Sequence, residues 1–240
     1  MFNHISNKLF SNKPISKKHL VGALSCAALL ATACSPNAQE SNQEQRQQTQ
    51  APMEQHATPM PGSLTAAQVE EMTRDWPESS RQAIKHMTDT YGAPATVGAG
   101  MAIWGETGPW KRTVVFNKEV PHHFPMEHPD VMQQWINYQA PVDKYNDLAE
   151  YDGSVVMERT AGEMSARCDK EPANFLAVNL AHEVATGKRT VDDARMEYGK
   201  QVKALMAGEK SDYTSGIMFS PPAADAAGFK DEPLAMMKDM

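Results

Sequence analysis

Cysteine is scarce in this chain, with three residues among 240. Cys26 lies inside an apolar run near the N-terminus and Cys34 follows it closely, so Cys168 is the one cysteine in the remainder of the sequence. If the first two are removed or modified, no intrachain disulfide can form. Stability must then come from a packed core, and the roughly 178 residues beyond residue 62 are enough for one domain of ordinary size.

Long hydrophobic runs are also lacking. The run Leu20–Leu30 has 11 residues, against the roughly 20 that a membrane-spanning helix needs. Four lysines and no acidic residue accompany it within residues 1–33, and the small residues Ala31-Thr32-Ala33 end the segment. This order of positive, apolar and small residues is typical of a secretory signal peptide. We therefore expect residues 1–33 to act as a targeting segment that is removed.

Basic residues are fewer than acidic ones, 23 against 30. Loss of residues 1–33 removes four basic residues and no acidic ones, which leaves a net charge of about −11 with neutral histidine. Such a surface argues against nucleic acid and anionic lipid headgroups as partners. Attachment to a membrane must then use acyl chains, and stable anchoring needs more than one.

The residues around Cys34 resemble the lipobox of bacterial lipoprotein precursors, with Leu30 and the small residues 31–33 directly before the cysteine. This resemblance implies a diacylglycerol on the Cys34 thiol, which would supply two acyl chains for a membrane anchor. With Ser35 as the next residue, it also implies sorting to the outer membrane of double-membrane bacteria, facing the periplasm or the surface. The same small residues suit an ordinary signal peptidase too, whose product would be secreted without lipid.

The segment that follows has no aromatic residue and little that could form a core. Residues 35–62 contain seven glutamines and four prolines. Such a composition cannot bury enough apolar surface to offset the entropy of ordering, so residues 34–62 are predicted to be a disordered tether. At about 5–6 Å times the square root of its length, the tether has a root-mean-square reach of roughly 30 Å.

Beyond the tether, the pattern of turns and apolar periodicity predicts a single α+β domain over residues 63–208, with a largely irregular tail at 209–240. We expect two β-hairpins interleaved with about six helices, because the strands come as adjacent pairs separated by turn residues. The expected hairpins lie at 97–116 and 154–168, and a short strand is expected at Ile217–Phe219. The expected helices begin at Thr65, Pro77, Pro129-Asp130, Pro141, Pro172 and Thr190.

Residues 65–117 have a partial resemblance to a known family. Thr65-x-x-Gln68-Val69, Gly92-x-Pro94 and Trp104, on two helices followed by strands, resemble the small outer-membrane lipoproteins of the BamE/SmpA class. This resemblance implies a non-catalytic accessory role beside another envelope protein. From Gly108 onward the chain also resembles uncharacterised bacterial proteins, which implies no function.

Histidine is concentrated in one short segment. His122, His123 and His128 lie among three prolines, with Met126, Glu127 and Asp130 nearby. Imidazole and carboxylate are ligands for zinc, and imidazole with thioether suits copper. The segment is therefore a candidate copper or zinc site with His122, His123 and His128 as ligands. The alternative is an exposed linker whose histidines have no metal.

Two further groups of residues have a functional and a structural interpretation. Cys168 could act as a nucleophile if Arg167 and His182 lowered its pKa, but the alternation of residues 164–168 predicts a buried, unreactive thiol. Trp104, Trp110 and Arg112 could form an exposed surface that stacks on a sugar or a partner protein. The alternative is that these tryptophans close a small core.

The sequence thus favours a lipid-anchored envelope protein that is a non-catalytic binding or accessory module, with another envelope protein as its partner. Periplasmic binding of copper or zinc through the His122–His128 segment is the first alternative. A hydrolase that uses Cys168 is the second, and the motifs favour the conclusion that the protein is not an enzyme.

Overall fold

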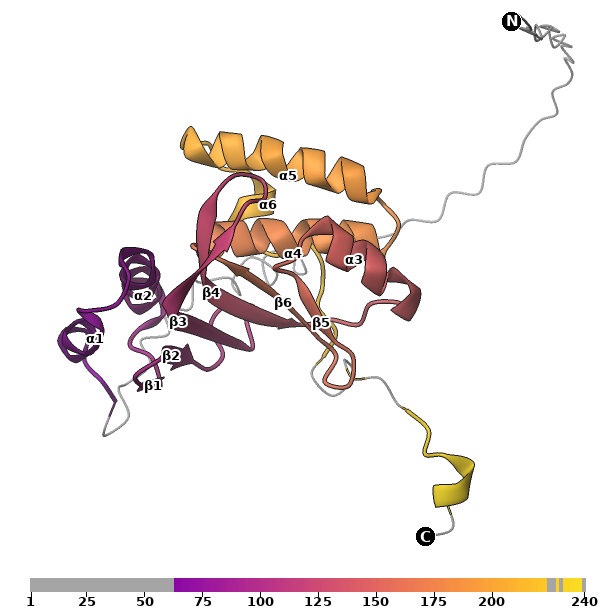
Figure 1. Cartoon of the computed structure of the whole chain (residues 1–240), viewed down its shortest axis with the longest axis horizontal. Coiled ribbons are helices and arrows are strands. Elements are labelled where there is room, and N and C mark those ends of the chain that lie inside the picture. The colour runs from indigo at the N-terminus through magenta and orange to yellow at the C-terminus, as the bar shows by residue number, and fades with distance from the viewer. Residues whose placement is uncertain (1–62, 224–227, 229–230, 239–240) are drawn as a thin grey trace, which may run out of the picture. The chain divides into compact units, whose positions relative to one another are not determined.

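The structure is a computed structural model that describes residues 63–223, 228 and 231–238 (Figure 1). The predicted signal peptide, Cys34 and the predicted tether lie outside the described residues. Within the described part of the chain, no helix is both long enough and apolar enough to cross a membrane.

Six antiparallel strands form one sheet in the order β1-β2-β3-β4-β6-β5. Two α-helices precede the first strand, one lies between β4 and β5, and three follow the last strand, so the chain is α+β, as the sequence predicts. Strand β4 pairs with β3 on one side and with β6 on the other, which joins the two expected hairpins into one sheet. The strands are β1 (Thr96–Val97), β2 (Met101–Trp104), β3 (Arg112–His122), β4 (His128–Asn137), β5 (Val156–Glu158) and β6 (Glu163–Cys168).

Local sequence signals set several of the helix starts. The Thr65 hydroxyl accepts a hydrogen bond from the backbone N–H of Gln68, and the Gln68 side chain accepts one from the backbone N–H of Thr65. This is the expected capping box. Thr190 likewise accepts from the backbone of Asp193. The α-helices are α1 (Ala66–Thr73), α2 (Glu78–Tyr91), α3 (Tyr145–Tyr151), α4 (Glu171–Ala185), α5 (Val191–Met206) and α6 (Asp212–Ser215); the 3-10 turns are η2 (Val142–Lys144) and η3 (Ala235–Met237).

Helix α4 is the central helix of the larger core. Leu176, Leu180 and Val184 are buried on it, as the sequence predicts, and nearly all of its other residues are buried as well. Figure 1 shows α3, α4 and α5 grouped together beside β4 and β6. A second, smaller cluster forms where α1 and α2 pack on β2 and β3, around Met87 and Trp104. The sheet therefore has two hydrophobic clusters, a larger and a smaller one, on the face that the helices cover.

The helix predicted to open at Pro129-Asp130 is wrong, because this segment is strand β4. Val131, Trp135 and Ile136 have side chains that favour strands, and partners on both sides complete the backbone hydrogen bonds of β4. Pro129 is tolerated at the start of the strand, directly opposite Pro121, where neither proline has an N–H to donate. A local proline signal is overridden here by pairing with distant strands.

The strand predicted at Ile217–Phe219 is also wrong. The side chain of Asn179 in α4 fixes this segment instead, since it donates to the carbonyls of Tyr213 and Gly216 and accepts from the backbone of Met218. A buried amide satisfies these backbone groups without a neighbouring strand. Residues 212–219 thereby pack on α4.

Candidate metal site

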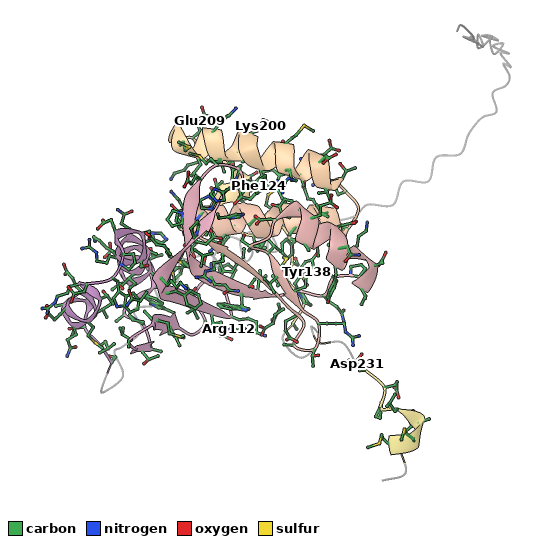
Figure 2. All side chains as sticks on the ribbon, viewed as in Figure 1. Arg112, Phe124, Tyr138, Lys200, Glu209 and Asp231 are labelled. Carbon is green, nitrogen blue, oxygen red and sulfur yellow. The ribbon has the colours of Figure 1, made fainter. Side chains whose placement is uncertain are left out.

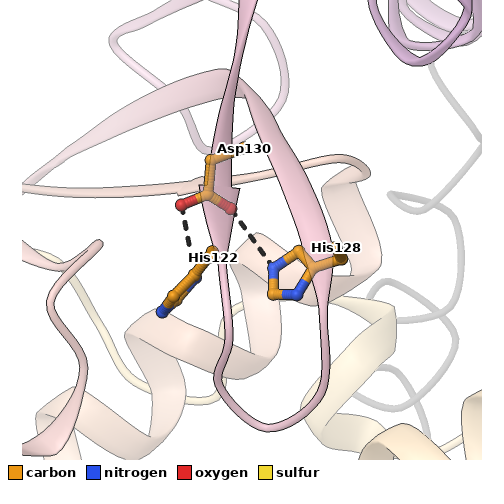
Figure 3. Close-up of side chains that lie close together, drawn as sticks. All are labelled: His122, His128 and Asp130. Atoms are coloured by element: carbon orange, nitrogen blue, oxygen red, sulfur yellow. Dashed lines mark ion pairs between the residues drawn. The ribbon is translucent and has the colours of Figure 1, made fainter.

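The end of the β3–β4 hairpin places three ligand-type side chains on one face (Figure 3). His122 pairs directly with His128, and Val120 pairs with Asp130 two positions further along the ladder. Opposite residues in an antiparallel pair share a face, as do residues two apart on one strand. His122, His128 and Asp130 therefore converge although the two histidines are six positions apart along the chain.

One carboxylate lies between the two imidazole rings. His122 Nδ1 is 3.2 Å from Asp130 Oδ2, and His128 Nε2 is 3.2 Å from Asp130 Oδ1. The ring centres of the two histidines are 4.9 Å apart. One ligand atom from each of the three residues lies within 4.8 Å of the others, which is a spacing that a single metal ion can bridge.

These contacts are ion pairs by distance, but they lack the direction of hydrogen bonds. His122 Nδ1, His128 Nε2 and Asp130 Oδ1 are buried, and none has a hydrogen-bond partner in the described structure. A buried polar atom without a partner costs about 1–3 kcal/mol. Ligand atoms around a tetrahedral zinc ion are about 3.3 Å apart, since the bonds are near 2.0 Å. The two 3.2 Å contacts have this length but use different oxygens of Asp130. One ligand atom from each residue lies within 4.8 Å of the others, so the three residues fit a zinc-sized ion once their side chains close around it.

Backbone contact fixes the orientation of His128. Its Nδ1 lies 2.9 Å from the carbonyl oxygen of Met126. A carbonyl can only accept, so Nδ1 carries the proton and the lone pair of a neutral ring is on Nε2, which faces Asp130. The Asp130 carboxylate raises the pKa of His128 above its ordinary value, against the effect of burial. Protons and a metal ion would therefore compete for the same nitrogen.

A second carboxylate lies on the far side of His122. Asp152, at the C-terminal cap of α3, is 1% exposed and has Oδ1 3.7 Å from His122 Nε2. The backbone N–H and the hydroxyl of Ser154 both donate to this oxygen, each at 2.8 Å. Burial raises the pKa of Asp152, and the hydrogen bonds from Ser154 oppose that rise. His122 is thus placed between two buried acids.

Aromatic packing encloses the hairpin end. Phe124, labelled in Figure 2, lies with its ring centre 5.1 Å from that of Tyr198 in α5, and the guanidinium of Arg195 stacks on it at 3.8 Å. Arg195 also donates to the carbonyl of Tyr151 at 2.6 Å, so α5 is tied to the end of α3 beside Asp152. These contacts hold the loop between the two histidines against α5.

A cavity of about 340 Å³ lies next to this packing. His128 and Cys168 line it on the sheet side, and apolar residues of α5 line it opposite. The ligand atoms of His122, His128 and Asp130 are nevertheless buried. Three protein ligands leave the fourth position of a tetrahedral zinc ion open, and the burial of the ligand atoms limits how a substrate could reach it.

Only part of this arrangement matches the set of ligands predicted from the sequence. His122 and His128 are brought together, whereas His123 is exposed and lies outside the cluster. Asp130 takes its place, and Asp152 lies behind His122. In a strand, His128 and Asp130 lie two residues apart and share a face, which is the signal that could have identified Asp130. The sequence analysis instead places Asp130 at the start of a helix, where this signal is lost. Asp152 has no such signal, because it comes from a different element.

Cys168 has the environment of a structural thiol. It is 5% exposed, and burial raises the pKa of its thiol well above the ordinary value. The thiol donates to Asp169 at 3.4 Å. His182, which the nucleophile hypothesis places nearby, instead contacts the hydroxyl of Tyr138 and stacks on Phe219. A reactive thiolate needs a lowered pKa, so these observations favour the structural interpretation.

The exposed aromatic surface expected from Trp104 and Trp110 does not form, because the two side chains are 2% and 1% exposed. Each indole N–H has a buried partner, the carbonyl of Gly92 for Trp104 and Glu171 for Trp110. These tryptophans close the core, which is the alternative that the sequence offers. Arg112 stacks on Trp135 and makes a bidentate ion pair with Glu163.

Glu171 is the centre of another polar cluster, and its hydrogen bonds are complete. Its carboxylate is 5% exposed and accepts from His86, Tyr91, Trp110 and Gln134 at 2.8–3.2 Å. Burial acts to raise its pKa, but the four donors together lower it below the ordinary value. A carboxylate with so many donors stabilises packing between α2, the sheet and α4, and has no lone pair directed at a ligand.

Comparison with protein-family models, curated proteins and solved structures finds no match to this chain. The function is therefore inferred from the geometry of the site.

Proposed function

We propose that this protein binds one transition-metal ion, zinc or copper(II), through His122, His128 and Asp130. The main support for this proposal is that three buried ligand atoms, none with a hydrogen-bond partner in the described structure, lie close together. Two imidazoles and a carboxylate suit these ions, and the bound metal would place positive charge beside the buried carboxylate of Asp130. The His128 ring is already oriented for this by the Met126 carbonyl.

Metal analysis of purified full-length chain tests this proposal. We expect about one zinc or copper ion per chain, and we expect His128→Ala and Asp130→Asn to reduce it to a trace. His123→Ala is the matched control, because it removes an imidazole from the same loop that lies outside the cluster. The proposal fails if the wild-type chain binds neither ion in a buffered titration, or if His123→Ala loses metal as completely as His128→Ala.

The place of action that we propose is the bacterial cell envelope, with the chain anchored to the outer membrane through acyl chains on Cys34. The support is the order of residues 1–34, which resembles a lipoprotein precursor. A non-catalytic envelope module that holds a metal ion, beside an envelope partner, combines this anchor with the enclosed site. The burial of the ligand atoms supports binding over catalysis, because a substrate would have to reach the fourth position that three protein ligands leave open.

A further inference from the structure

We infer that Asp152 is a positioning residue for the metal site, because its buried carboxylate faces Nε2 of His122 and so favours binding of the ion at Nδ1. This inference depends on the proposed metal site at His122, His128 and Asp130. It assigns a role to a residue that is 30 positions from His122 and that belongs to α3, not to the hairpin.

The first step is the placement of the two nitrogens of His122. Nδ1 faces Asp130 at 3.2 Å, and Nε2 faces Asp152 at 3.7 Å. A neutral imidazole has one N–H and one lone pair, and the partner of one nitrogen decides which is which. Both nitrogens face a carboxylate, and the nearer one, Asp130, is beside Nδ1. An ion bound at Nδ1 takes the place of a proton there, so the one N–H of the ring is then on Nε2, where the Asp152 carboxylate can accept and cannot donate.

The second step is that Asp152 is held in place for this role. Two donors from Ser154 fix its Oδ1, and the side chain is 1% exposed. Its Oδ2 is buried and has no hydrogen-bond partner in the described structure. For a residue at the end of a surface helix this is costly, since a buried charge needs partners. A metal ion on the other side of the His122 ring would offset part of that cost.

The third step is a general property of metal-bound histidine. Its second nitrogen usually donates to a carboxylate or carbonyl, and loss of that outer partner lowers metal affinity about 10–100-fold. His128 already has such a partner in the Met126 carbonyl. Asp152 offers His122 a carboxylate on the corresponding side, at 3.7 Å, which is an ion-pair distance and longer than a hydrogen bond.

The test is zinc affinity of the full-length chain, measured by competition with a chelator, for wild type and Asp152→Asn. We expect a loss of about 10–100-fold in Asp152→Asn, because the amide can present N–H groups to Nε2 and favour the wrong tautomer. Asp147→Asn is the matched control, since it removes another carboxylate of α3 that is paired with Lys144 and not with His122. Its affinity should stay within a few-fold of wild type. In a His122→Ala background, Asp152→Asn should have no further effect.

Nitrogen-15 NMR of His122 in the zinc-loaded chain adds a readout that a merely structural role would not move. We expect zinc on Nδ1 and the proton on Nε2 in wild type, and a partial change to zinc on Nε2 in Asp152→Asn. If that variant does not fold, the wild-type spectrum and a smaller affinity loss in Ser154→Ala keep the inference testable. A wild-type chain that binds zinc while Asp152→Asn binds it equally well would overturn this inference and leave the metal site standing. A wild-type chain that binds no zinc would instead refute the metal site.

Discussion

At the scale of single residues, buried carboxylates separate structure from candidate function in this protein. Glu171 accepts four hydrogen bonds and Glu163 pairs with two basic side chains, so both have complete sets of partners. Asp130 and Asp152 are equally buried, yet each has an oxygen without a hydrogen-bond partner in the described structure. Because unsatisfied buried oxygens are costly, their presence side by side around His122 points to a ligand.

The pH dependence of stability should report on Glu171. Its pKa is lowered in the folded protein, so its contribution is fully present above the ordinary value of 4.5 and is lost as pH falls through the lower folded value. Glu171→Gln should therefore reduce the free energy of unfolding by about 2–3 kcal/mol at pH 7, and by clearly less at pH 3. Urea unfolding of both proteins at the two pH values measures this. An equal difference at both would show that the charge of Glu171 contributes nothing.

At the scale of elements, the β3–β4 hairpin creates the site and also limits what the sequence could predict. Hairpin β5–β6 and the buried face of α4 follow from local alternation and helical periodicity, and both are confirmed. Strand β4 was missed because Pro129-Asp130 is a local helix signal, while its pairing with β3 and β6 is non-local. The same error hid Asp130 as a neighbour of His128, so two of the three clustered residues were predicted and the third was not.

The packing of Phe124 on α5 should control how fast a bound ion leaves. Phe124→Ala removes the contacts with Tyr198 and Arg195 that hold the loop between the two histidines. Aromatic and cation–π contacts contribute about 0.5–1.5 kcal/mol each, so metal release into a chelator should accelerate about tenfold. Stopped-flow mixing of zinc-loaded chain with excess chelator gives the rate. Phe116→Ala is a suitable control, because Phe116 lies beneath Arg167 and not on α5; release as fast in that variant would argue against a role for the loop.

At the scale of the whole molecule, the acidic composition and the sequence of residues 1–34 support the same proposal. A chain with a net charge of about −11 after the proposed loss of residues 1–33 is repelled by anionic headgroups, so the membrane attachment that we propose is covalent. The same negative field raises the local concentration of cations around the domain. An acidic, tethered module with an enclosed His–His–Asp site would therefore gather metal ions close to a membrane surface.

The anchor can be tested apart from the metal. Cys34→Ala should abolish labelling by radioactive palmitate and move the chain from the membrane fraction to the soluble fraction, because no acyl chain can then be attached. Cys168→Ala should leave both unchanged, since that thiol is buried in the folded domain. Membrane attachment that persists unaltered in Cys34→Ala would refute the lipoprotein assignment.

X-ray absorption of the zinc-loaded full-length chain is the direct test of whether His122, His128 and Asp130 together bind one metal ion. The account predicts a first shell of nitrogen and oxygen near 2.0 Å, outer scattering from two imidazole rings, and no sulfur. Asp130→Asn should weaken binding, while His123→Ala should leave the spectrum unchanged. A zinc–sulfur distance near 2.3 Å would assign the ion to Cys168, and a spectrum without imidazole scattering would contradict the account outright.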